Sequence, residues 1–215
     1  MKKTLTIVFA TILVFMGIQV QAQSFSAGLT AGVVTSQVDG DGYGGFHQLG
    51  WTAGVFGRLP SEGPGAFQME LKYSLYGAHS DAKELELGMN PMSIRLHYIE
   101  VPLMYHYCLS GLTINGKTWE RLSLEAGVSA DFLAKGTQSA DQESQYENTS
   151  WLFFSMTANA GAQYNVTERL GFNVRVMYSI LPCRINPQVA LFSFQHYYNF
   201  AIQACVVYAI FPAGK

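Results

Sequence analysis

Apolar residues recur at every second position along much of this chain, with small or polar residues between them. In residues 122–132, Leu, Leu, Ala, Val, Ala and Phe alternate with Ser, Glu, Gly, Ser and Asp, and residues 25–33 follow the same rule. Successive side chains of a β-strand point to opposite faces, so each such segment has one apolar face and one polar face. A soluble sandwich would bury the apolar face, whereas a membrane barrel turns it toward lipid and keeps the polar face in its lumen.

The beginning of the chain has the features of a secretory signal peptide. Two lysines follow the first Met, residues 5–18 form a short apolar segment, and residues 20–22 (Val-Gln-Ala) provide a small-residue cleavage site. We therefore expect a signal peptide over residues 1–22 and one mature domain over residues 23–215, with an uncleaved N-terminal membrane helix as the alternative. No later run approaches the roughly 20 apolar residues of a transmembrane helix.

The composition is typical of an exported β protein. Charged residues make up only 13% of the chain, about half of the share in soluble domains, and a soluble surface this poor in charge would aggregate. A formal net charge of −2 gives no electrostatic basis for binding nucleic acid. The three cysteines, Cys108, Cys183 and Cys205, have no metal-ligand spacing. We expect no structural disulfide, and a bridge between Cys108 and Cys205 is the alternative.

The mature chain contains eight strand candidates, at residues 24–35, 49–59, 66–77, 94–108, 121–133, 151–164, 169–181 and 197–211. Long polar or Gly-rich loops follow the odd-numbered strands, at Ser36–Gln48, Ala78–Ser93, Ala134–Ser150 and Pro182–His196. Tight turns follow the second and sixth strands. Long outer loops, short periplasmic turns and an even strand count describe a bacterial outer-membrane barrel. The longer connection 109–120 contains Ser-Gly and Asn-Gly pairs, which predict a small extra hairpin.

These patterns predict an all-β fold: an eight-stranded antiparallel up-and-down transmembrane β-barrel with a filled polar lumen. Aromatic residues near strand ends fit interfacial girdles, where apolar rings meet lipid and polar ring atoms meet water. They are Trp51, Tyr73, Tyr105, Tyr107, Trp151, Tyr164, Tyr198 and Tyr208. A soluble lipocalin-like barrel or sandwich is the alternative, but it does not explain the strongly apolar face beside a charged one.

Several ordered motifs resemble the PorT-like family of outer-membrane β-barrel proteins. They are Gly28-Leu29-Thr30-Ala31-Gly32, Gly50-Trp51-Thr52-Ala53-Gly54-Val55-Phe56, Phe67-Gln68-Met69-Glu70-Leu71-Lys72-Tyr73-Ser74, His97-Tyr98-Ile99-Glu100-Val101-Pro102-Leu103-Met104-Tyr105 and Leu124-Glu125-Ala126-Gly127-Val128. The fourth is similar to that family's Tyr-x-Glu-x-Pro strand. The resemblance implies an eight-stranded barrel located in the outer membrane of a Gram-negative cell. The namesake takes part in protein secretion across that membrane and in the linked gliding machinery.

The alternation places twelve polar residues toward the lumen: Arg58, Gln68, Glu70, Lys72, Glu100, Glu125, Asp131, Asn159, Gln163, Asn173, Arg175 and Gln203. An eight-stranded barrel is narrow enough for side chains to fill it, and buried charges are costly unless they are paired. We expect a structural charge network of Arg58, Glu70, Lys72, Glu100, Glu125, Asp131 and Arg175. A proton path, a narrow ion pore or a small-ligand pocket is the alternative. Pro102, which cannot donate to a strand ladder, predicts a bulge or distortion.

No residue pattern supports catalysis, a metal or a cofactor. His79, Ser80 and Asp81 are adjacent in sequence, which is poor geometry for a proton relay. Residues 39–42 (Asp-Gly-Asp-Gly) lack the remaining ligands of a calcium loop. His47 and His196 are isolated candidates at the outer rim.

We therefore expect a non-enzymatic integral outer-membrane β-barrel protein with a structural or partner-binding role, accessory to a secretion or gliding machinery as in the PorT-like family. A narrow transport or ligand-binding barrel is the first alternative, and an outer-membrane lipid-modifying enzyme is the second. The expected partners are outer-membrane lipid, lipopolysaccharide and envelope proteins such as secretion-system components.

Overall fold

The computed structural model describes residues 25–40, 45–61, 63–80, 85–86, 88, 91–110, 113–114, 117–139, 145–147, 151–185 and 196–212. The predicted signal peptide lies outside these residues. Within them the strands are β1 (Ser26–Asp39), β2 (Gln48–Pro60), β3 (Gly65–His79), β4 (Ser93–Cys108), β5 (Thr113–Ile114), β6 (Lys117–Thr118), β7 (Leu122–Ser139), β8 (Gln145–Glu147), β9 (Phe154–Asn165), β10 (Leu170–Ser179) and β11 (Tyr198–Phe211). No helix in the described part of the chain is long and apolar enough to cross a membrane.

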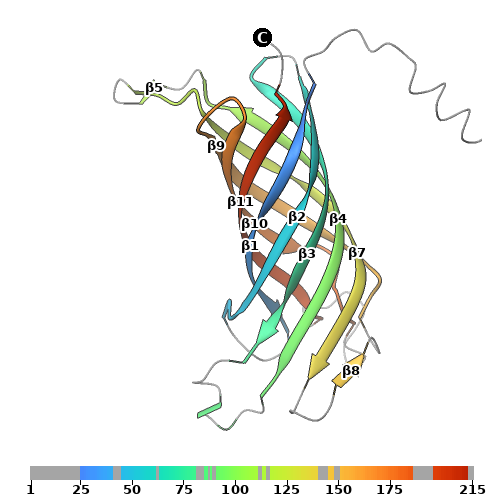
Figure 1. The fold of residues 1–215 in the computed structure, drawn as a ribbon. Coiled ribbons are helices and arrows are strands. Elements are labelled where there is room, and N and C mark those ends of the chain that lie inside the picture. Colours follow the sequence, from blue (N-terminus) through green and yellow to red (C-terminus); the bar gives the residue numbers. More distant parts are fainter. Residues whose placement is uncertain are drawn as a thin grey trace, which may run out of the picture.

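Eight of these strands form a closed antiparallel barrel (Figure 1). The hydrogen-bonded order is β4-β3-β2-β1-β11-β10-β9-β7, and pairing between β4 and β7 closes the ring. This confirms the predicted eight-stranded up-and-down barrel. The short strand β8 extends one end of β7, and β5 and β6 form the separate two-stranded hairpin that the connection 109–120 predicts.

The two ends of the barrel differ in their connections. The short connections from β2 to β3 and from β9 to β10 lie at one end of the barrel, which we call the turn end (Figure 1). The β5–β6 hairpin and both ends of the described chain lie there too. The longer connections leave from the other end, which we call the loop end. In outer-membrane barrels the short turns face the periplasm and the long loops face the outside.

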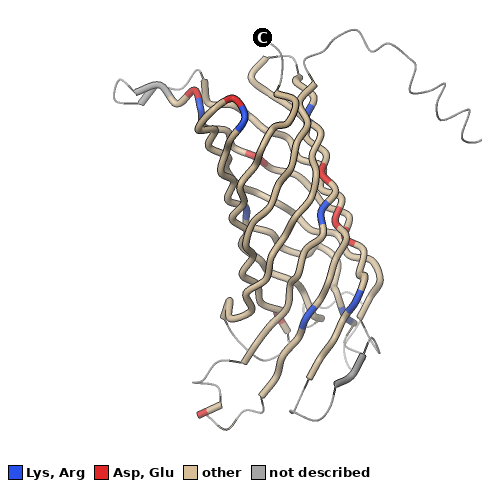
Figure 2. The backbone as a smooth tube through the Cα atoms, in the orientation of Figure 1, with Lys and Arg blue, Asp and Glu red and all other residues tan. Residues whose placement is uncertain are grey.

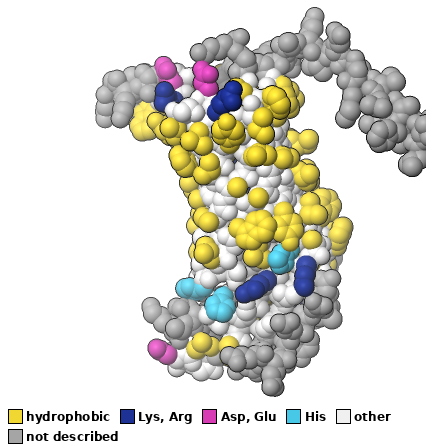
Figure 3. All heavy atoms as spheres, in the orientation of Figure 1, with side chains coloured by type: hydrophobic (Ala, Val, Ile, Leu, Met, Phe, Trp, Pro, Cys, Tyr) yellow, Lys and Arg dark blue, Asp and Glu magenta, His cyan; other side chains and the backbone are white. Residues whose placement is uncertain are grey.

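The alternation continues through the barrel wall and separates two surfaces. Outward side chains are apolar and exposed over the middle of the wall, whereas charged side chains of the face in Figure 3 gather at its two ends. The tube in Figure 2 also passes through Lys, Arg, Asp and Glu residues within the wall. Those on the strand interiors are buried, so they point into the lumen.

At the loop end the two faces exchange character: apolar side chains point into the lumen and charged side chains point outward. On β4, Ile94 and Leu96 are buried inside while Arg95 is exposed, and on β7 Leu133 is buried while Lys135 is exposed. This polar-out pattern belongs to a surface in water, so these strand ends project beyond the lipid. The lumen there contains an apolar cluster formed by Val34, Val38, Tyr76, Ala78, Ile94, Leu96, Tyr98, Leu133, Met177, Cys183 and Ala201. An apolar cluster that was not predicted therefore shares this half of the lumen with buried polar side chains such as Ser36 and Asn199.

The strands are also longer at the loop end than the alternation indicates. β7 continues to Ser139, six residues past its predicted end at 133. A register shift between His97 and Tyr98 on β4 leaves Ala134 of β7 without a partner residue, because Tyr98 pairs with Leu133 and His97 with Lys135. This bulge ends the regular alternation, although pairing with β4 continues.

Of the bulge or distortion predicted at Pro102, the structure shows a local distortion and no bulge. The β4–β7 partner of Pro102 is Ser129, and the β4–β7 register is unchanged around it. Between β3 and β4, the pairs Met69–Leu103 and Lys72–Glu100 flank Pro102 and have the same register, with no pair between them. The missing N–H of Pro102 therefore interrupts one ladder locally without shifting it.

Candidate functional site in the barrel lumen

Arg175 of β10 is the centre of the polar half of the lumen. Its Nη2 donates to Glu70 Oε1 at 2.8 Å, and its Nη1 donates to Glu70 Oε2 at 3.1 Å. Its Nε also donates to Glu125 Oε1 at 2.7 Å. Glu70 lies on β3. In either direction around the ring, three strands separate β3 from β10. The bidentate Arg175–Glu70 pair therefore joins opposite walls of the barrel across the lumen.

Lys72 connects this pair to a second carboxylate on β4. Its Nζ lies 3.4 Å from Glu70 Oε2 and 3.7 Å from Glu100 Oε2, and it donates to Gln203 Oε1 of β11 at 3.1 Å. Glu100 also accepts a 2.7 Å hydrogen bond from Ser74 and a short one from Tyr76. Lys72 and Glu100 are both fully buried side chains, so their charges are satisfied entirely by protein groups.

Arg58 and Asp131 have different partners from those that charge pairing predicts. Arg58 donates to Gln68 Oε1 at 2.7 Å and to Gln163 Oε1 at 2.8 Å, and no ion pair joins it to a carboxylate among the described residues. Asp131 accepts short hydrogen bonds from the hydroxyls of Ser129 and Thr157. Five of the seven predicted network residues are therefore linked by ion pairs, namely Glu70, Lys72, Glu100, Glu125 and Arg175.

Sequence reasoning missed several groups in this lumen. His106 is buried, and its Nε2 lies 3.3 Å from Glu125 Oε2, although neither ring nitrogen has a hydrogen bond in the described structure. It occupies an even-numbered position on β4 like Glu100, so the alternation could have identified it. The hydroxyls of Ser74 and Tyr76 carry no charge and left no comparable signal.

A segment after β10 packs on the apolar cluster at the loop end. Arg184 lies between two aromatic rings, with its Cζ 5.4 Å from the Trp151 centroid and 5.1 Å from the Tyr197 centroid. Bridges join Trp151 to Arg184 and Arg184 to Tyr197, and the adjacent Cys183 is buried in the apolar cluster. Trp151 was predicted at a strand end in an interfacial girdle. It instead precedes β9 and packs on Arg184.

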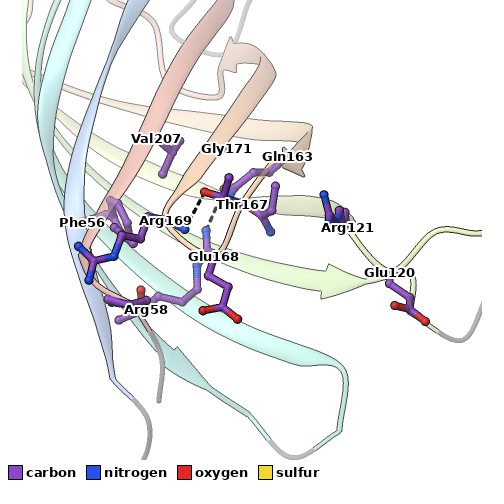
Figure 4. A pocket seen from close by; sticks show the side chains of 14 residues that line it. Phe56, Arg58, Glu120, Arg121, Gln163, Thr167, Glu168, Arg169, Gly171 and Val207 are labelled. Carbon is purple, nitrogen blue, oxygen red and sulfur yellow. Dashed lines mark hydrogen bonds between the residues drawn. The ribbon is translucent and has the colours of Figure 1, made fainter. Parts of the chain in front are cut away.

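The turn end has a cavity of about 400 Å³ that opens between the strand ends (Figure 4). Its lining includes Arg58 from β2, Arg121 just before β7 and Arg169 from the turn between β9 and β10. In Figure 4, Arg58 and Arg169 gather at one side of the cavity, and Arg121 and Glu120 lie at the other. Glu168 and the buried side chains of Phe56, Val207 and Ala209 also line it.

The remaining predicted candidates form no catalytic or metal-binding group. His47 and His79 are exposed at the loop end, and His196 is buried. Asp81 and residues 41–42 lie outside the described residues. Within the described part of the chain, no three His, Cys, Asp or Glu side chains are placed to share a metal ion. All three cysteines have thiols and form no disulfide.

Residues 21–183 match the model of a family described as the outer membrane protein beta-barrel domain. The chain belongs to this family. It is thus an outer-membrane β-barrel protein, located in the cell outer membrane. A comparison with curated proteins found no significant match.

Two solved structures are similar to this family member. One is Ail, the attachment invasion locus protein of Yersinia pestis, solved in complex with the heparin analogue sucrose octasulfate. It has 14% identity and a TM-score of 0.49, over 87% of this chain and 99% of Ail. The other is Neisserial surface protein A, with 12% identity and a TM-score of 0.49, over 86% of this chain and 96% of that protein.

Proposed function

We propose that this outer-membrane barrel is non-enzymatic, does not conduct ions, and serves as a structural or partner-binding component of the envelope. The observation that carries this proposal is the ion pair of Arg175 with Glu70. It crosses the lumen from wall to wall and occupies the space that a permeating ion would need. Breaking a buried pair leaves an uncompensated charge, which costs about 3–5 kcal/mol.

The apolar cluster at the loop end supports the same conclusion. An ion that passed the charge network would next meet Leu96, Tyr98 and Met177, which offer little to replace its water. The segment of Cys183 and Arg184 covers this cluster between Trp151 and Tyr197. Two successive barriers of different chemistry therefore occupy the lumen.

The finer part of the proposal concerns a partner at the turn end. The β5–β6 hairpin projects sideways from the barrel rim (Figure 1), and Trp119 beside it is 39% exposed. An exposed aromatic side chain at the base of a projecting hairpin is a suitable anchor for a protein interface. The motif resemblance to the PorT-like family makes a secretion or gliding component of the envelope the proposed partner.

Planar-bilayer recording tests the non-conducting part. The purified barrel should give no steady current under conditions in which an open porin, inserted in the same membranes, conducts. Steady single-channel currents from the folded wild-type barrel would refute the sealed lumen.

Photo-crosslinking in cells tests the partner. A crosslinker at position 119 should capture an envelope protein, and a crosslinker at the lipid-facing Val128 of β7 should not. A variant that lacks residues 112–119 also lacks this crosslinker, so its partners are compared with those of the wild type by chemical crosslinking of the tagged barrel. If the deletion leaves every crosslinked protein in place, the hairpin is not the docking element.

A further inference from the structure

The turn-end cavity is lined by three arginines and by two glutamates, Glu120 and Glu168, so its lining has an excess of one positive charge. Arg58, Arg121 and Arg169 all line it, and no ion pair joins any of the three to a carboxylate among the described residues. Arg58 is held by two neutral amide oxygens, and Arg121 donates to the Val166 carbonyl at 2.8 Å. Elsewhere in the lumen, Arg175 and Lys72 both face carboxylates. Three guanidinium groups that outnumber the carboxylates of the lining, and that form no ion pair with a described carboxylate, are suited to an anion.

One wall of the same cavity is apolar. Phe56, Val207 and Ala209 form a small buried cluster, and all three line the cavity. Gln163 and Asn165 supply polar groups between this wall and the arginines. A site with one apolar wall and one cationic wall discriminates against a bare anion, because a fully hydrated ion gains nothing from the apolar wall.

The cavity ends inside the barrel. Its inner boundary is the chain of hydrogen bonds from Gln163 through Arg58 to Gln68, whose Nε2 donates to Glu70 at 2.6 Å. The Arg175 network begins at this point and fills the lumen beyond it. A ligand must therefore enter and leave from the turn end, which faces the periplasm. This geometry is that of a binding site and not of a passage.

We propose that this cavity binds a carboxylate attached to a compact apolar group, the chemistry of the C-terminal end of a peptide. The carboxylate lies among the guanidinium groups of Arg58 and Arg169, and the apolar group packs on Phe56 and Val207. A volume of about 400 Å³ is within the range of small-ligand sites. The inference deepens the partner-binding role proposed above by naming the chemistry that the turn end recognises.

Direct binding to the folded barrel in lipid nanodiscs tests the proposal, with N-acetylleucine as the probe. Titration followed by calorimetry or NMR should show saturable binding. N-acetylleucinamide, which has the same shape and no charge, should bind at least tenfold more weakly. Inorganic phosphate is the second control, because it shows whether the cavity binds a small anion that has no apolar group. Equal binding of the acid and the amide, or binding of phosphate without N-acetylleucine, would overturn the proposal.

Matched variants locate the site. Arg169→Gln removes an exposed side chain on a turn and should weaken N-acetylleucine binding at least fivefold without affecting folding. Val207→Thr keeps the side-chain shape but adds a polar group to the apolar wall, and it should also weaken binding. Arg95→Gln, at an exposed position near the loop end, is the control and should leave binding unchanged. Indistinguishable effects of Arg169→Gln and Arg95→Gln would overturn the assignment.

These measurements do not depend on the crosslinking or conductance results. If N-acetylleucine fails to bind, the sealed barrel and its hairpin interface remain testable by their own experiments. Conversely, ion conduction by the barrel would refute the sealed lumen. The effects of Arg169→Gln and Val207→Thr on N-acetylleucine binding would still decide whether the cavity is the binding site.

Discussion

Glu100 of β4 is paired directly with Asp131 of β7, and both side chains are buried in the lumen. Like charges at directly opposed positions of neighbouring strands destabilise a sheet. Glu100 is compensated by Lys72 and by hydroxyl donors, whereas Asp131 accepts only from Ser129 and Thr157 in the described structure. Asp131 is therefore the least compensated carboxylate of the network.

Asp131→Asn should therefore stabilise the barrel. The amide has nearly the same shape, it can still bond both hydroxyls, and it removes the repulsion from Glu100. At mildly alkaline pH, where the Asp131 carboxyl is ionised, we expect the free energy of unfolding to rise by about 0.2–1 kcal/mol, the range for directly opposed cross-strand pairs. Urea unfolding of the reconstituted barrel, followed by tryptophan fluorescence, measures this. A loss of stability would show that the Asp131 charge is needed.

Arg175→Gln should have the opposite effect. It leaves Glu70 and Glu125 buried without their main cation, and the expected loss is about 3–5 kcal/mol in the free energy of unfolding. Adding Glu70→Gln to the same chain should recover part of the loss, because one uncompensated charge is removed. The same urea titration measures both variants. If the double variant is no more stable than Arg175→Gln alone, the coupling inferred from the bidentate contact is wrong.

Gly161 on β9 should not tolerate a larger residue. A Cβ at this position would lie 2.9 Å from Glu125 Oε1 and would also overlap the carbonyl oxygen of Val174. Gly161→Ala must therefore displace the backbone or Glu125, at a cost of about 1–3 kcal/mol for overpacking. Gly57→Ala is the control, because its Cβ would meet only the Phe25 ring, at 3.3 Å. Equal unfolding midpoints for the two variants would contradict this explanation.

The sequence predicts the wall of this barrel better than its contents. Alternation identifies the strands and the inward polar set because the central part of each strand follows the same period of two. It does not show that Arg175 contacts Glu70, since that contact depends on the register of every strand pair between β3 and β10. The turn-end cavity could not be predicted for the same reason, because its lining comes from several strands whose relative register the sequence does not reveal.

The apolar cluster in the loop-end half of the lumen was missed for a more specific reason. The pattern inverts near residues 94–98, where Arg95 faces outward and Ile94 and Leu96 face inward. The sequence itself shows this change of pattern. Without knowing where the lipid ends along the strand, however, a reader would take these residues for an ordinary strand end. The stack of Arg184 between Trp151 and Tyr197 joins residues from two different connections, and no periodicity predicts such a contact.

Thiol labelling tests whether this stack holds the loop-end segment in place. Cys183 is fully buried in the apolar cluster and Cys108 is partly exposed near the turn end. A small maleimide should therefore label Cys108 in the folded wild type much faster than Cys183, with mass spectrometry to separate the two sites. Arg184→Ala removes the cation from between the two rings, at a cost of about 0.5–2 kcal/mol in contact energy. The segment should then open more often, and labelling of Cys183 should become severalfold faster while that of Cys108 stays unchanged. Identical Cys183 rates in the wild type and the variant would show that the apolar cluster, and not the Arg184 stack, keeps the loop end closed.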